Sequence, residues 1–141
     1  PEFQQEVAKI GDVISFQFMD EFQKATLAKP IDSSYYNLLV AEGMKTPGWV
    51  FKQAMDGLME GKLASEIHKI QAPALFFWGS KDSFVGRKDQ EFMRSAIRQS
   101  KLIVYEGTGH ALHWEEPKRF VDDLLDFILN TGSNPSSKIR M

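Results

Sequence analysis

The sequence contains no cysteine, no excess of basic residues and no apolar run long enough to cross a bilayer. Without cysteine, the chain has no disulfide, no thiolate metal ligand and no cysteine nucleophile. Its 17 Lys and Arg against 19 Asp and Glu give a formal net charge of −2, which indicates neither nucleic acid nor a membrane surface as a partner. The N-terminus lacks the apolar segment of a signal peptide, so we expect a cytoplasmic protein.

The first half of the chain has the apolar spacing of helices. Ile14, Phe18 and Phe22 recur every four residues, and similar patterns follow in two later segments. Residues that favour helix N-termini precede each pattern. The expected helix starts are Asp12, Ser33 or Ser34, and the pair Thr46-Pro47.

The second half predicts strands and helices in alternation. Residues 74–78 are a continuous apolar run, which suits a strand buried on both faces of a parallel sheet, and residues 101–105 indicate a second buried strand. A helix with an apolar stripe at 92–97 lies between them, and a last helix begins after Pro117. Because two strands make a poor sheet by themselves, we expect them to be part of a larger one.

We therefore expect an α/β fold with three regions. Residues 4–69 form a helical region, residues 70–130 form a parallel β-α-β-α unit, and the small polar residues 131–141 form a flexible tail.

An aspartate and a histidine follow the two predicted strands. Asp82 ends Gly-Ser-Lys-Asp after the first strand, and His110 ends Gly-Thr-Gly-His after the second. Open parallel sheets place their ligands at these strand ends, and a carboxylate that orients an imidazole is half of a Ser-His-Asp triad. The alternatives are a structural role for Asp82 in an Asx-turn and a purely structural hydrogen bond for His110.

These segments together resemble the last two strand-helix units of the α/β-hydrolase superfamily, and the helical first half resembles the cap of such enzymes. The resemblance covers about residues 7–129 and implies a partial α/β-hydrolase fold of the serine-hydrolase type. Asp82 then matches the triad acid and His110 the general base. The residues that carry the resemblance are 70–73, 78–82, 105–110, 114–117 and Phe120.

The resemblance also implies a small-molecule, ester-like substrate and no cofactor. Aromatic residues of the cap line the acyl or alcohol pocket in such enzymes, and the candidates are Phe18, Phe22, Trp49 and Phe51. His110-x-x-His113 is followed by two glutamates, but it opens on a glycine turn and lacks a metal-binding motif, so we expect no metal site.

The sequence contains neither Gly-x-Ser-x-Gly nor Gly-x-Asp-x-Gly, the turns that present a nucleophile in this superfamily. We therefore expect the isolated chain to be inactive, with Asp82 and His110 serving a nucleophile supplied elsewhere. The alternative is a non-catalytic chain that self-associates, because unpaired strand edges invite a homodimer with a continuous sheet.

Overall fold

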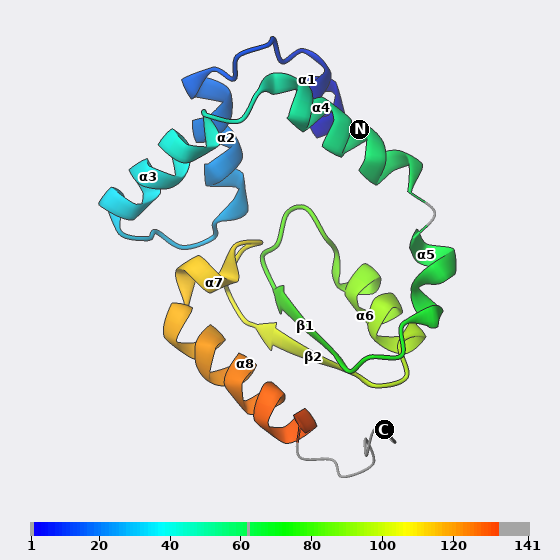
Figure 1. The fold of residues 1–141 in the computed structure, drawn as a ribbon. Coiled ribbons are helices and arrows are strands. Elements are labelled where there is room, and N and C mark those ends of the chain that lie inside the picture. Colours follow the sequence, from blue (N-terminus) through cyan, green and yellow to red (C-terminus); the bar gives the residue numbers. More distant parts are fainter. Residues whose placement is uncertain (1, 62, 133–141) are drawn as a thin grey trace, which may run out of the picture.

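The computed structural model describes residues 2–61 and 63–132 of the chain. Figure 1 shows a group of helices at one end of the molecule and, below it, a small sheet with helices on either side. The elements in chain order are α1 (Glu2–Ala8), α2 (Phe16–Thr26), α3 (Ser33–Gly43), α4 (Gly48–Glu60), α5 (Leu63–Glu66), a 3-10 turn η1 (Ile67–Lys69), β1 (Ala74–Gly79), α6 (Arg87–Ala96), β2 (Ser100–Tyr105), α7 (Leu112–Glu115) and α8 (Pro117–Gly132).

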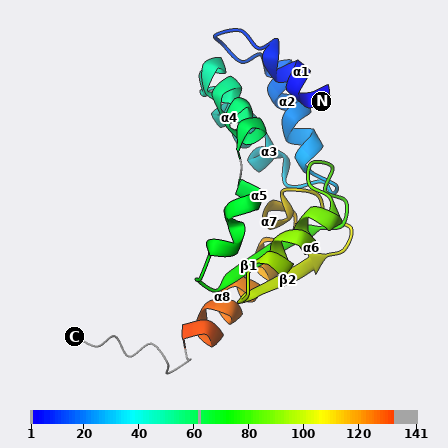
Figure 2. The same ribbon diagram turned by 90° about the vertical axis from the view of Figure 1, so that its right-hand side faces the viewer.

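The sheet is parallel, as the sequence predicts, and each strand lies within one residue of its expected range. β1 pairs with β2 in a register that runs from Ala74 opposite Ser100 to Gly79 opposite Tyr105. Figures 1 and 2 place the strands between α6 and α8. The Phe77 ring packs on Phe120 of α8, with 4.7 Å between ring centroids. This register brings the loops that follow the two strands side by side.

The strands are less covered than a continuous apolar run predicts. Residues 74–77 of β1 are half-buried, and only Trp78 and Gly79 at its end are buried. On α8, four apolar side chains are about half exposed or more, namely Val121, Leu125, Ile128 and Leu129. The described residues therefore enclose the sheet only in part, which agrees with the expectation that these strands are part of a larger sheet.

The helical region has a core of its own. The buried residues are Val7, Ile10, Ile14, Met19 and Val40. The short helix α1, which the sequence pattern does not predict, packs against α4 and buries Val7 almost completely. Helix α1 thus contributes Val7 to the core of the helical region.

The expected helix N-caps are displaced by one to three residues. Ser15, and not Asp12, caps α2 by accepting a hydrogen bond from the N–H of Phe18. Asp32, and not Ser33 or Ser34, caps α3 in the same way, and α4 has Pro47 at its N-cap instead of Thr46. Neighbouring polar residues are equally suited to capping, and the point where the backbone leaves its extended conformation decides which one acts.

Replacing Ser15 by alanine is expected to lower the free energy of unfolding by about 1 kcal/mol, because the Phe18 N–H loses its acceptor. The matched control is Asp12→Ala, which is expected to change that free energy by less than about 0.5 kcal/mol. Urea denaturation measures both. An effect of Asp12→Ala equal to that of Ser15→Ala would contradict the assignment of the cap.

The described C-terminal end differs slightly from expectation. Helix α8 continues to Gly132, two residues into the segment expected as a flexible tail, and residues 133–141 lie outside the described residues. Within 2–61 and 63–132, none of the helices has the length and apolar character needed to cross a membrane.

Candidate active site

The candidate site lies where the loops after β1 and β2 meet. Backbone and side-chain hydrogen bonds join the two loops directly. They are Ser80 N–H to Tyr105 O at 2.9 Å, Lys81 N–H to Thr108 O at 2.9 Å, and Gly107 N–H to Ser80 Oγ at 2.8 Å. Ser80 therefore has a structural role, and the two loops behave as one bonded unit at the carboxyl end of the sheet.

Asp82 and His110 lie in contact in this unit. His110 Nδ1 is 2.9 Å from Asp82 Oδ2. The Asp82 side chain is only 5% exposed, whereas that of His110 is 47% exposed. The prediction that the two side chains stand side by side above adjacent parallel strands is confirmed.

The second oxygen of Asp82 serves the loop itself. Asp82 Oδ1 accepts hydrogen bonds from the N–H of Phe84 at 2.8 Å and of Val85 at 3.1 Å. The Asx-turn and the pairing with His110 are therefore not exclusive: one oxygen fixes the loop and the other fixes the imidazole. A carboxylate held at both oxygens cannot rotate away from the ring that it orients.

The other ring nitrogen of His110, Nε2, belongs to a half-exposed side chain. Nε2 makes no hydrogen bond within the part of the chain that the structure describes, and nearly half of the side chain is open. With Nδ1 donating to Asp82, Nε2 carries the lone pair and can accept a proton. The ring of Phe84 packs edge-on against the imidazole, with centroids 5.2 Å apart.

Two glycines allow the close approach of backbones on which this geometry depends. A Cβ at Gly79 would lie 2.5 Å from Thr108 O and even nearer to Gly109 O. A Cβ at Gly109 would lie 2.6 Å from Thr26 O and 2.7 Å from Ala28 N, at the end of α2. The end of β1, the loop that carries His110 (the histidine loop, residues 106–111) and the end of α2 thus approach one another without any side chain between them.

Three of the four aromatic residues predicted to bind substrate lie together and extend toward His110. The centroid of Phe51 is 5.8 Å from that of Phe18 and 5.7 Å from that of Phe22, and Phe22 lies 6.1 Å from Phe84. We call Phe18, Phe22, Phe51 and Phe84 the aromatic cluster. Trp49 is 58% exposed and makes none of these ring contacts, because it lies on another face of α4.

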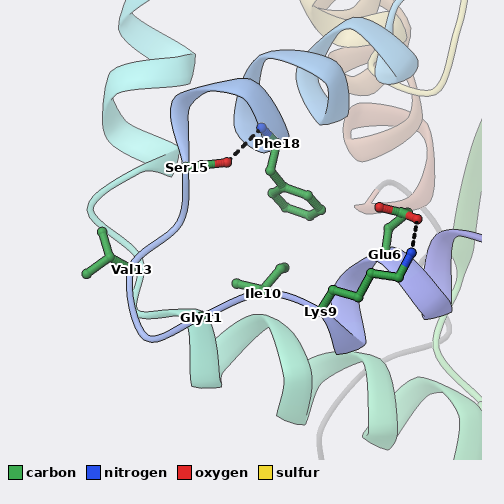
Figure 3. Close-up of a pocket in the computed structure, with 7 residues that line it drawn as sticks. All are labelled: Glu6, Lys9, Ile10, Gly11, Val13, Ser15 and Phe18. Carbon is green, nitrogen blue, oxygen red and sulfur yellow. Dashed lines mark hydrogen bonds and ion pairs between the residues drawn. The ribbon is translucent and has the colours of Figure 1, made fainter.

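A surface hollow borders the aromatic cluster at Phe18, which does not contact His110 directly. It is lined by Phe18 together with Glu6, Lys9, Ile10, Gly11, Val13 and Ser15. Figure 3 shows the Phe18 ring directed into the hollow toward Ile10, with the Glu6–Lys9 ion pair at its rim.

Sequence reasoning missed two residues of the site, Phe84 and Glu115. Phe84 follows Asp82 by two positions in a loop, where no periodic pattern marks an aromatic side chain as important. Glu115 stands in the segment 114–117 that carries part of the family resemblance, which was the available signal, but its hydrogen bonds depend on the fold.

His113 belongs to the packing around α7 and α8. Its ring lies against Trp114 and Phe120, with centroid distances of 5.0 and 5.7 Å. Partial burial lowers the pKa of His113, and repulsion from His110 lowers it further. No group of three potential metal ligands occurs within residues 2–61 and 63–132.

Comparison with known proteins gives one family. The family model described as "alpha/beta hydrolase fold" matches residues 12–117. Monoacylglycerol lipase ABHD6 from Bos taurus is 26% identical over 76 residues, which are 54% of this chain and 23% of that protein. A 2-hydroxy-6-oxononadienedioate/2-hydroxy-6-oxononatrienedioate hydrolase from Pseudomonas putida is 36% identical over 64 residues, 45% of this chain and 22% of that protein.

Solved structures show the same architecture. A bromoperoxidase from Bacillus anthracis superposes with a TM-score of 0.79 at 20% identity, over 91% of this chain and 47% of that one. An esterase from Exiguobacterium antarcticum superposes with a TM-score of 0.75 at 21% identity, over 81% of this chain and 42% of that one. The chain thus spans less than half of these structures and less than a quarter of the two sequence relatives.

Proposed function

Because this chain belongs to the alpha/beta hydrolase fold family, we propose that it supplies the acid and the general base of a serine-hydrolase-type triad. The single observation that carries the proposal is the 2.9 Å contact between His110 Nδ1 and Asp82 Oδ2 at adjacent parallel strand ends. The nucleophile is then a residue outside these 141, since no nucleophile turn occurs among them.

The chemistry follows from the two ring nitrogens. Asp82 Oδ2 accepts a hydrogen bond from the Nδ1–H of His110 and so favours the tautomer in which Nε2 is the base. Nε2 takes the proton of the nucleophile's hydroxyl group as the hydroxyl oxygen attacks a carbonyl carbon. The carboxylate of Asp82 stabilises the resulting imidazolium. Nε2 then gives the proton to the leaving group as the bond to the carbonyl carbon breaks, and it next activates a water molecule that hydrolyses the acyl intermediate and restores the nucleophile.

We propose an ester-like small molecule with an apolar part as the substrate. The support is the aromatic cluster, in which Phe84 touches His110 and Phe22 continues the apolar surface into the helical region. The name of one relative from Bos taurus, monoacylglycerol lipase ABHD6, also supports a substrate of this kind. The apolar part would pack on the phenyl rings while the carbonyl carbon of the ester faces the nucleophile beside Nε2.

The test has two parts. The 141-residue chain is expected to hydrolyse p-nitrophenyl esters no faster than a heat-inactivated sample, because a base without a nucleophile has nothing to activate. Robust hydrolysis that a serine-directed inhibitor abolishes would contradict this. The coding sequence before Pro1 is expected to contain Gly-x-Ser-x-Gly, whereas Gly-x-Asp-x-Gly would place the chain with dehalogenases or epoxide hydrolases.

A second candidate function is self-association as a non-catalytic module. The observation that favours it is the incompletely covered sheet, next to the exposed apolar side chains of α8 such as Leu125 and Leu129. A homodimer that pairs free strand edges would extend the sheet. Light scattering at micromolar concentration distinguishes the candidates: a concentration-independent dimer supports self-association, and a monodisperse monomer excludes it.

A further inference from the structure

Glu115 joins the histidine loop to the helical region through a single atom. Its Oε1 accepts hydrogen bonds from the N–H of Gly109 at 3.0 Å and from the N–H of Ala28 at 2.7 Å. One donor precedes His110 directly, and the other follows the end of α2. Hydrogen bonds to a carboxylate are short and strong, so this oxygen fixes the separation between the two backbones.

The residue after His110 is tied to the same segment. The N–H of Ala111 donates to Thr26 O at 2.9 Å. Both sequence neighbours of His110 are therefore held against residues 26–28, one directly and one through Glu115. The loop that carries Asp82 is bonded to the end of α2 as well, because Ser83 Oγ donates to Ala25 O at 3.0 Å.

The second oxygen of Glu115 adds an independent observation. Oε2 is enclosed and has no hydrogen-bond partner within the described ranges 2–61 and 63–132. Enclosing this carboxylate oxygen without a partner costs free energy, and the two hydrogen bonds to Oε1 offset part of that cost. The adjacent Glu116 differs, since its contacts with Lys29 and Arg119 join side chains at the surface and bypass the histidine loop.

We propose that Glu115 is a positioning residue for His110: its carboxylate sets the path of the histidine loop so that Nδ1 faces Asp82, and it makes this geometry depend on the end of α2. The inference rests on the proposed function, in which His110 is the base. Movement of the segment 26–28 in the helical region would then be transmitted to the imidazole through the two N–H groups on Glu115.

Nuclear magnetic resonance of the full chain tests this inference with two readouts. The first is the downfield resonance of the His110 Nδ1 proton, which reports the bond to Asp82. The second is hydrogen exchange at the amides of Gly109 and Ala28. Glu115→Ala is expected to remove the downfield resonance and to speed both amides about tenfold to a hundredfold. Glu115→Gln keeps an acceptor oxygen and is expected to retain the resonance.

Glu116→Gln is the matched control. It breaks the ion pair with Lys29 and is expected to leave the resonance and the Gly109 amide unchanged. If Glu115→Ala does not fold, Glu115→Asp replaces it. The shorter side chain keeps the charge but cannot reach both donors, so the downfield His110 resonance is expected to be lost in this variant as well. Retention of the resonance in Glu115→Ala, or in Glu115→Asp where it stands in, overturns the inference. Absence of the resonance in the unaltered chain counts instead against the proposed function.

Discussion

Replacing His110 by alanine is expected to lower kcat by about a millionfold, measured in the polypeptide that carries this chain together with its nucleophile. The reason is that Nε2 of His110 has no hydrogen-bond partner among the described residues and its ring contacts the aromatic cluster at Phe84, while Nδ1 is bonded to Asp82. Loss of the imidazole leaves the nucleophile protonated at neutral pH. Ester hydrolysis under single-turnover conditions measures the chemical step.

Asp82→Asn is the companion variant and is expected to cost about ten-thousandfold in kcat, because an amide presents a donor to Nδ1 and favours the wrong tautomer. His68→Ala is the control, since His68 is an exposed residue of η1 distant in sequence from both loops. It is expected to leave kcat within about twofold, as surface substitutions do. A decrease in kcat of less than about tenfold for His110→Ala would contradict the role of His110 as general base.

Replacing Gly79 by alanine is expected to lower the free energy of unfolding by about 4 kcal/mol or more. A Cβ there would lie 2.5 Å from Thr108 O and nearer still to Gly109 O, and both are backbone atoms that cannot rotate away. The two loops would have to separate, which also breaks the hydrogen bond from Lys81 to Thr108. Thermal and urea denaturation measure the loss.

Gly57→Ala is the matched control for this prediction. A Cβ at Gly57, inside α4, meets nothing within 4 Å. The substitution is expected to stabilise the chain by about 0.5–1 kcal/mol, because alanine loses less backbone entropy in a helix. Equal effects of the two substitutions would contradict the close approach of the two loops.

The parts of the fold that repeat a simple pattern could be predicted from the sequence. The segments 74–78 and 101–105 predict strands because they are short, mainly apolar and followed by glycine-containing turns, and the structure confirms them as β1 and β2. The contact between Asp82 and His110 could be predicted as well, because parallel strands bring their carboxyl ends to one edge.

The remaining features depend on contacts between distant residues. Helix α1 is too short to show a period, and burial of Val7 against other helices stabilises it. Trp49 and Phe51 look alike in sequence, yet the rotation of α4 exposes one and places the other in the aromatic cluster. Glu115 acquires its role only when Ala28 and Gly109 meet.

The central claim is that the two loop side chains act as one hydrogen-bonded pair, and the most direct measurement is the proton spectrum of the His110 ring in unaltered chain and in Asp82→Asn. We expect a downfield Nδ1 proton that exchanges slowly in the unaltered chain and is lost in Asp82→Asn. A His110 ring with no such proton, or one that is indifferent to Asp82→Asn, would contradict it.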